Sequence, residues 1–244
     1  MSAGRPDPLP GVDGLLAEQL DYYRRRAFEY DEWWQRLGRY DHGADHAAEW
    51  ERQVGEVEDA LEGFAPGGDV LELAGGTGWW TERLAGTAST LTVLDASVET
   101  LELNRRRLGP RAGLRYVVAD LFDWEPDRRY DTVFFSFWLS HVPRRRFAPF
   151  WELVWRCLSP QGRVFLIDNR RGLEELLVEH HIVEEADGVQ RRTLNDGSAH
   201  RVVKVYWEPA ELTARLGLEG WEAEIGGTRW FIYGSARPAA HARR

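Results

Sequence analysis

The chain has 244 residues, of which 43% are hydrophobic and 29% charged, and its formal net charge is −9. This length suffices for one or two domains with a sizeable core, and the acidic balance argues against a surface that binds duplex nucleic acid. No apolar run approaches the roughly 18 residues that span a bilayer, and the first residues lack the apolar core of a secretory signal. We therefore expect a cytoplasmic protein that binds neither membrane nor nucleic acid.

Residues 1–63 are predicted to form a helical extension ahead of the first strand. From about residue 14 this extension is rich in aromatic residues, among them Tyr22, Tyr23, Tyr30 and Trp34. Its second half carries apolar residues at helical spacing, which predicts an amphipathic helix that packs on a sheet. Arginine runs at 24–26, 105–107 and 144–146 are typical of solvated helix faces, although an anionic substrate could use one.

The stretch VLELAGGTG at residues 70–78 is the most informative part of the sequence. Its apolar run Val70–Leu73 predicts a buried parallel strand. The glycines that follow are Gly75, Gly76 and Gly78. They allow a sharp turn and a close approach of the backbone to a ligand. Helical residues resume directly afterwards, so the loop lies where open α/β sheets bind ligands. A tight loop without a ligand is the alternative for this segment alone.

The residues of this loop argue against two common phosphate sites. The glycine spacing is not the G-x-G-x-x-G of dinucleotide-binding folds, and no Gly-Lys-Ser/Thr follows as in a P-loop. The carboxylate of Glu72, in the last turn of the strand, would repel a pyrophosphate but attract an ammonium group. S-adenosylmethionine carries an ammonium and a sulfonium and no phosphate, so the loop favours this cofactor.

The second predicted strand, Thr90–Leu94, leads directly into a carboxylate, Asp95. A carboxylate at such a strand end accepts hydrogen bonds from the ribose hydroxyls of a nucleotide-type cofactor. The alternative is a structural one, in which Asp95 or Ser97 caps the helix that follows.

The third predicted strand, Leu114–Ala119, also ends in a carboxylate, Asp120, which is followed by the apolar Leu121 and Phe122. An adenine ring needs an acceptor for its exocyclic amine and apolar walls for its faces, and this cluster offers both.

Residues 68–170 resemble the core of class I S-adenosylmethionine-dependent methyltransferases, in particular the small bacterial enzymes that act on small molecules. The matching segments, in order, are VLELAGGTG at 70–78, TVLDAS at 92–97, VVADLFDW at 117–124, YDTVFFSFWLSHVP at 130–143 and LSPQGRVFLIDN at 158–169. Ala74 stands where the family usually has its first glycine. The resemblance implies an α/β fold, with a doubly wound Rossmann-like sheet of seven strands whose last strand is antiparallel.

The resemblance also implies which residues form the site. Cofactor contacts are expected from Glu72, Ala74, Gly75, Gly76, Gly78, Asp95, Ala96, Asp120, Leu121, Phe122, Ser136, Tyr22 and Tyr30. Acceptor contacts are expected from Tyr23, Trp34, Trp138 and His141, and the aromatic N-terminal segment is expected to form a lid. His141, just after the fourth strand, is the candidate catalytic base, with a loop-packing histidine as the alternative.

No metal is expected at this site. The single cysteine, Cys157, lies on an apolar stripe, and no Cys/His cluster has zinc spacing. Asp168 and Asn169 end the fifth strand, where metal-dependent catechol methyltransferases place ligands, but no supporting carboxylate has convincing spacing. Ser136-Phe137-Trp138 stands where nucleic-acid amino-methyltransferases carry Asn/Asp-Pro-Pro-Tyr, which favours a small-molecule acceptor.

The part of the chain after the fifth strand, predicted at Gly162–Asn169, is expected to add a cap and the end of the sheet. Alternating arms around Asn195–Ser198 predict a hairpin within a cap at about 173–209. A helix at Pro209–Leu218 and an antiparallel strand pair at Trp221–Ile225 and Trp230–Ser235 would complete the core, at 64–236. Residues 237–244 are expected to be a disordered tail.

These features together predict a methyltransferase that uses S-adenosylmethionine to methylate O, N or C of a small, partly aromatic or apolar metabolite. One alternative is a non-catalytic module that binds the cofactor and acts through a partner. The other is an oxidoreductase with a nicotinamide dinucleotide, against which Glu72 and the absent G-x-G-x-x-G both argue.

Overall fold

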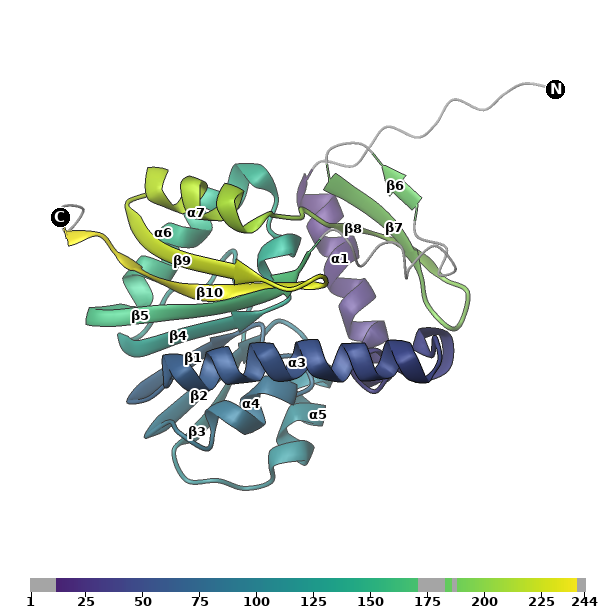
Figure 1. Ribbon diagram of the computed structural model, residues 1–244, viewed down its shortest axis with the longest axis horizontal. Helices are drawn as coiled ribbons and strands as arrows, with labels where there is room; N and C mark the ends of the chain where they lie inside the picture. The colour runs from purple at the N-terminus through teal and green to yellow at the C-terminus, as the bar shows by residue number, and fades with distance from the viewer. Residues whose placement is uncertain (1–11, 171–182, 186–187, 241–244) are drawn as a thin grey trace.

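The computed structural model describes residues 12–170, 183–185 and 188–240, and its centre is one seven-stranded sheet (Figure 1). The strand order is β3-β2-β1-β4-β5-β10-β9. The strands are β1 (Asp69–Leu73), β2 (Thr90–Asp95), β3 (Leu114–Val118), β4 (Tyr130–Ser136), β5 (Leu158–Asn169), β9 (Trp221–Gly227) and β10 (Phe231–Pro238). The first five are parallel, and β10 runs antiparallel to β5 and β9. The predicted doubly wound sheet with an antiparallel last strand is confirmed.

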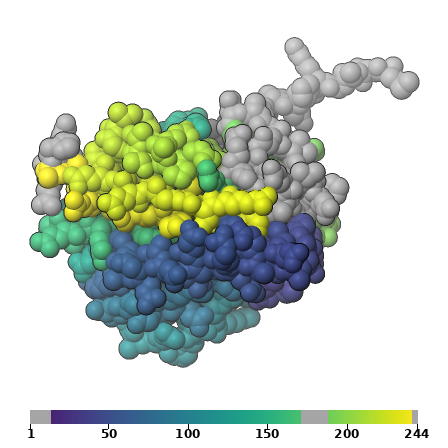
Figure 2. All heavy atoms as spheres, viewed as in Figure 1, coloured from purple at the N-terminus to yellow at the C-terminus, as the bar shows by residue number. Residues whose placement is uncertain are grey.

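Helices cover both faces of this sheet. One face carries α3 (Ala44–Phe64), α4 (Trp79–Leu84) and α5 (Val98–Leu108), and the other carries α6 (Phe147–Cys157) and α7 (Pro209–Leu218). Successive side chains of a strand point to opposite faces of the sheet. Val70 therefore packs in the core beneath α3, α4 and α5, and Leu71 packs in the core beneath α6 and α7. Both faces are buried, which explains the continuous apolar runs of the strands. In the space-filling view α3 lies directly against β10 (Figure 2).

A second, smaller layer lies beyond the carboxyl ends of the parallel strands. It consists of α1 (Val12–Arg26), α2 (Tyr30–Trp34), the 3-10 turn η1 (Gly38–Tyr40) and a three-stranded sheet of β6 (Val183–Glu185), β7 (Val189–Thr193) and β8 (Ala199–Val203). Helix α1 packs against β8, and Figure 1 shows the two side by side. The predicted hairpin around Asn195–Ser198 is confirmed as β7 and β8, whereas β6 was not predicted.

Most predicted strand ends agree with the structure to within two residues, and two differ by more. Strand β5 begins at Leu158 rather than Gly162, and β10 continues to Pro238. Arg237 and Pro238 were expected in the disordered tail. They are instead ordered in β10, because the neighbouring strand β9 extends far enough to lie opposite both residues. Of the expected tail, residues 241–244 lie outside the described residues. No helix in the described ranges is long and apolar enough to cross a membrane.

Candidate active site

A cavity of about 860 Å³, partly open to solvent, lies at the carboxyl ends of β1, β2, β3 and β4 beneath α1 and α2. Most of the residues predicted to contact cofactor or acceptor line it. They are Tyr23, Tyr30, Ala74, Gly76, Asp95, Ala96, Asp120, Leu121, Phe122, Ser136, Trp138 and His141. We call this space the strand-end cavity. Its lining of apolar side chains with a few polar groups is typical of small-molecule and cofactor sites.

The carboxylate of Asp95 ties the glycine-rich loop to the next helix. Its Oδ2 accepts a hydrogen bond from the Gly76 backbone N–H at 3.0 Å, and its Oδ1 accepts one from the Ser97 N–H at 2.9 Å. Burial raises the pKa of Asp95, and these backbone donors act in the opposite direction. The N-cap of α5 is Ser97, whose Oγ accepts from the Thr100 N–H at 3.1 Å. Ser97, and not Asp95, is therefore the N-cap of α5. Asp95 lines the strand-end cavity.

Glu72 does not line the strand-end cavity but lies beneath the loop. Its side chain is 1% exposed, and its Oε2 has no hydrogen-bond partner among the residues that the structure describes. Burial raises the pKa of this carboxyl group to about 8. A Cβ on Gly75 would lie 3.4 Å from Oε2 and only 2.3 Å from Val93 Cγ1, so the loop can settle on Glu72 only with glycine there. Gly75 likewise lies behind the cavity wall.

Two residues in the wall of the strand-end cavity have left-handed backbone conformations. Ala74 and Phe137 each have φ of +53°, a region that side chains with a Cβ rarely occupy. Ala74 stands at the position where the family usually has glycine. The backbone there keeps a conformation that glycine adopts easily, although the residue is alanine. Gly78, with φ of +94°, has no room for a side chain, because a Cβ there would lie 2.9 Å from the side chain of Asn104. Such strain gathers at functional sites.

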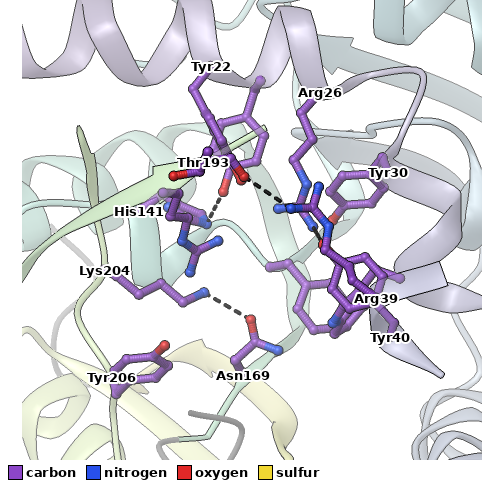
Figure 3. A pocket seen from close by; sticks show the side chains of 14 residues that line it. Tyr22, Arg26, Tyr30, Arg39, Tyr40, His141, Asn169, Thr193, Lys204 and Tyr206 are labelled. Atoms are coloured by element: carbon purple, nitrogen blue, oxygen red, sulfur yellow. Dashed lines mark hydrogen bonds between the residues drawn. The ribbon is translucent and has the colours of Figure 1, made fainter. Parts of the chain in front are cut away.

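A second cavity, of about 660 Å³ and also partly open, adjoins the first (Figure 3). The two share four wall residues, namely Tyr23, Tyr30, Phe137 and His141. The remaining wall comes from α1, η1, the end of β5, β7 and the segment after β8. It contains four basic side chains, Arg26, Arg39, Arg192 and Lys204, with tyrosines between them. We call this space the basic cavity.

Arg26 and Arg192 are buried residues, with exposed fractions of 7% and 8%. Arg26 donates to the Tyr40 hydroxyl at 3.3 Å, and Arg192 donates to Gln190 Oε1 at 2.9 Å. Within the described part of the chain, neither has a carboxylate at ion-pairing distance, whereas Arg39 pairs with Glu29. Burying an unpaired charge is costly, so these two groups leave positive charge that an anionic ligand would compensate.

Lys204 and Asn169 form the opposite wall of the basic cavity, facing Arg26 across it in Figure 3. Lys204 Nζ donates to Ser140 Oγ at 2.7 Å and to Asn169 Oδ1 at 2.9 Å, and lies 3.8 Å from Asp168 Oδ1. These contacts fix the orientation of the Asn169 amide, because an ammonium group can only donate. The Asn169 Nδ2 is buried and has no partner among the described residues, so it offers a donor to a ligand.

His141 stands between the cavities with both ring nitrogens engaged. Nδ1 lies 2.7 Å from the carbonyl oxygen of Val203, and Nε2 lies 2.7 Å from the Tyr23 hydroxyl. A carbonyl only accepts, so Nδ1 carries the ring proton and Nε2 accepts from Tyr23. Burial lowers the pKa of His141 well below its ordinary value, and the positive charges of Lys204 and Arg192 lower it further. The ring is therefore neutral, and no free nitrogen of it faces a ligand.

The structure does not bring Trp34 or Tyr22 to the strand-end cavity. Trp34 lines neither cavity and stacks on Trp79, with ring centroids 5.0 Å apart, inside a cluster of tryptophans. Tyr22 lines the basic cavity instead. Helix α2 is held over the glycine-rich loop through Asp31, which accepts from Thr77 Oγ1 at 2.6 Å and pairs with Arg107. Trp34 thus belongs to the packing that supports this helix.

Sequence reasoning missed Arg192, Lys204 and Asn169 as site residues and left Arg26 in a run of solvated arginines. A signal was present in the hairpin, where Gln190 and Arg192 occupy the buried positions of β7 and Arg191 the exposed one. Polar residues on the inward side of an alternating strand indicate a buried polar site. In the described ranges, no group of three or more His, Cys, Asp or Glu side chains is placed to hold a metal ion.

Comparisons with known proteins agree with this geometry. A family described as a methyltransferase domain matches residues 70–162. Two solved structures of DhpI, one titled as a complex with SAH and one as a complex with SAM and HEP, have TM-scores of 0.76. They are 37% and 39% identical in sequence, and the matches cover 93% and 94% of this chain and 98% and 100% of those chains.

Curated relatives match over a shorter length. The ubiquinone/menaquinone biosynthesis C-methyltransferase UbiE of Azotobacter vinelandii is 32% identical over 124 residues, which are 48% of each chain. Demethylmenaquinone methyltransferase of Clavibacter sepedonicus is 35% identical over 102 residues, 41% of this chain and 40% of its own. This chain therefore spans about half the length, or less, of these curated relatives.

The likeness to DhpI extends over nearly the whole of both chains, and the family match covers the strands and loops that form the strand-end cavity. The cofactor of this family is S-adenosylmethionine. The chain belongs to the class I S-adenosylmethionine-dependent methyltransferases.

Proposed function

We propose that this protein transfers a methyl group from S-adenosylmethionine to an oxygen of a small anionic acceptor held in the basic cavity. The observation that carries the proposal is the pair of buried guanidinium groups, Arg26 and Arg192, in a cavity that shares Tyr23 and His141 with the strand-end cavity. An anion would compensate their charge and would lie next to the cofactor.

The residues of the strand-end cavity fit the proposed cofactor. Asp95 would hold the ribose through its carboxylate, and Asp120 with Leu121 and Phe122 would hold the adenine. Glu72 would act from beneath the loop, by supporting its backbone, because its side chain lies outside the cavity lining. When bound, the cofactor supplies an electrophilic methyl group on a sulfonium.

The shared wall would shield the reacting atoms. Tyr23, Tyr30 and Phe137 present aromatic groups where the cavities meet, and aromatic faces attract a sulfonium cation and exclude water. Holding an acceptor oxygen in line with the methyl group, in a dry site, can supply about 7–11 kcal/mol of the barrier reduction. The residues around the shared wall therefore act mainly by positioning.

Among the O, N or C acceptor atoms that the sequence left open, an anionic oxygen is favoured. A phenol, an alcohol or a carbon acid needs a base, but His141 Nε2 already accepts the Tyr23 hydroxyl. A phosphonate, phosphate or carboxylate oxygen is ionised at neutral pH and needs none. The DhpI complex that contains SAM together with HEP supports a cofactor and a second compound bound at once.

The test compares two neighbouring arginines of β7. Arg192→Met should raise the KM for the acceptor about 10–100-fold, since a hydrogen bond to a charged group contributes about 1.5–3 kcal/mol. The affinity for S-adenosylhomocysteine should stay unchanged. Arg191→Met is the matched control, because Arg191 points away from the cavity and should leave both values as they are.

The acceptor panel for this test should contain small phosphonates, phosphates and carboxylates beside neutral phenols and alcohols. Methylation of the neutral compounds at an equal rate in the protein and in Arg192→Met would contradict the proposal. Tight cofactor binding with no methyl transfer to any compound of the panel would favour the non-catalytic module instead.

A further inference from the structure

The hydrogen bond between Tyr23 and His141 uses the only proton that the tyrosine can donate. Val203 fixes the other side of the imidazole ring, so Nε2 stays an acceptor directed at Tyr23. The rings of Tyr23 and His141 meet edge to face with centroids 5.0 Å apart, and both line the basic cavity. The pair as it stands offers the cavity no hydrogen-bond donor.

An anion in this cavity can only accept hydrogen bonds, so it competes with His141 for the Tyr23 proton. If the hydroxyl turns to the anion, the Tyr23 oxygen and His141 Nε2 face each other as two acceptors about 2.7 Å apart. A buried pair of that kind is unfavourable unless one of the atoms gains a proton. Nε2 is the atom that can gain it, because the other ring nitrogen already carries its own.

The charges around His141 decide when this proton is taken up. The groups that face it are Tyr23 and Arg26 of α1, Tyr30 of α2, Arg192 of β7, Lys204 after β8 and, through Ser140, Asp168 at the end of β5. All three of these cations, Lys204, Arg192 and Arg26, oppose an imidazolium when no anion is bound. A bound anion reverses this local balance, since it lies among the same cations.

We propose that Tyr23 and His141 form a proton-coupled donor pair, in which anion binding turns the Tyr23 hydroxyl to the anion while His141 takes up one proton from solvent. His141 Nε2 then donates to the Tyr23 oxygen and Nδ1 keeps its bond to Val203. Tyr23 keeps its proton, and the single new bond is the N–H on His141. The inference rests on the proposed function, since it requires an anion in the basic cavity. His141 is a positioning residue that acts through Tyr23.

The sign of the pH dependence follows from this linkage. The anion-bound protein holds a proton on His141 that the empty protein lacks, so anion affinity is highest at low pH. It is lost as the pH rises through the pKa of His141 in the bound state. Between the pKa values of His141 in the free and the anion-bound protein, one proton is taken up per anion and the dissociation constant rises by about tenfold for each pH unit. Above the bound-state value no proton is taken up and the dissociation constant levels off.

The experiment is calorimetric titration of the whole protein with sodium sulfate, which keeps both its charges near neutrality and does not itself exchange protons. Repeating it between pH 6 and 8 in buffers of different ionisation enthalpy counts the protons taken up. We expect up to one proton per sulfate, with the uptake declining as the pH rises. His141→Gln and Tyr23→Phe should bind sulfate more weakly and with no uptake. His200→Gln, a buried histidine of β8 outside the pair, should leave the uptake unchanged.

Nitrogen-15 NMR of the unsubstituted protein provides a second readout that does not depend on how well the variants fold. Without sulfate, His141 should show a protonated Nδ1 and an unprotonated Nε2, and sulfate should protonate Nε2. Sulfate binding without proton uptake, or with His141 still neutral at pH 6, overturns the donor pair but leaves the anion site standing. No sulfate binding, or binding that Arg192→Met leaves unchanged, overturns the anion site of the proposed function itself.

Discussion

The two cavities that meet at Tyr23 and His141 are assembled in different ways. The floor of the strand-end cavity comes from loops that directly follow β1, β2, β3 and β4. The basic cavity draws on α1, α2 and η1, on the end of β5, and on the hairpin of β7 and β8. Local strand-loop-helix sequence therefore builds the cofactor side of the site, whereas contacts between distant segments build the side assigned to the acceptor.

The largest expected effect tests whether Trp34 supports helix α2 by packing or lines the acceptor site. Trp34→Ala removes a buried ring that stacks on Trp79 and contacts further aromatic residues, and should lower the free energy of unfolding by about 3–5 kcal/mol. Thermal or denaturant unfolding measures this loss. The exposed Phe28 of the same region is the control, because Phe28→Ala should change stability by less than about 0.5 kcal/mol. A stable Trp34→Ala variant with a large loss of acceptor affinity would return Trp34 to the acceptor site.

The next effect tests whether a change in the strand-end cavity weakens cofactor binding without affecting the basic cavity. Asp95→Ala removes the carboxylate that binds Gly76 and faces the strand-end cavity, and should weaken S-adenosylhomocysteine binding by about 1.5–3 kcal/mol. Calorimetric titration with S-adenosylhomocysteine measures this change. Sulfate affinity in the basic cavity should not change, and Asp127→Ala, at an exposed position, should affect neither ligand. An unchanged affinity for S-adenosylhomocysteine would remove Asp95 from the cofactor site.

A smaller, pH-dependent effect is expected beneath the cofactor loop. Burial raises the pKa of Glu72 from 4.5 to about 8, so between these values the folded protein holds a proton that the unfolded chain has released. Stability without cofactor should therefore fall as the pH rises through this interval. Glu72→Gln should flatten that slope in thermal unfolding curves, whereas Glu224→Gln, at an exposed position, should preserve it. Equal slopes in Glu72→Gln and the unsubstituted protein would show that this carboxyl group titrates normally.

The smallest effect concerns backbone strain in the same loop. An alanine in the left-handed conformation destabilises the folded protein by about 1–2 kcal/mol, and glycine at the same position would remove this strain. Glycine also has more conformational freedom in the unfolded chain, which offsets about 0.4–1 kcal/mol of that gain in stability. Ala74→Gly should thus be neutral or stabilising by up to about 1.6 kcal/mol, as should Ala65→Gly at φ of +51°. Ala60→Gly, inside α3, should instead destabilise by about 0.5–1 kcal/mol. Equal losses of stability in all three would mean that Ala74 is not strained.

The sequence by itself determined the sheet and the cofactor side of the site. The apolar runs and the carboxylates that end them identify β1, β2 and β3, and parallel strands bring their carboxyl ends to one edge. Asp95, Asp120 and Gly76 therefore come together wherever this sheet forms, and the structure places all three in one wall. Helix α7 begins and ends where predicted because its start at Pro209 and its apolar spacing are local signals.

Only the tertiary structure decided which charges are buried and what they face. Arg24, Arg25 and Arg26 have the same local sequence pattern, yet Arg26 alone is buried, because the packing of α1 on β8 turns that side of the helix inward. His141 was visible as a histidine after the fourth strand, but its bonds to Tyr23 and Val203 come from residues 118 and 62 positions away along the chain. Sequence patterns report the periodicity of a single segment, whereas burial of a charge depends on what other segments supply around it.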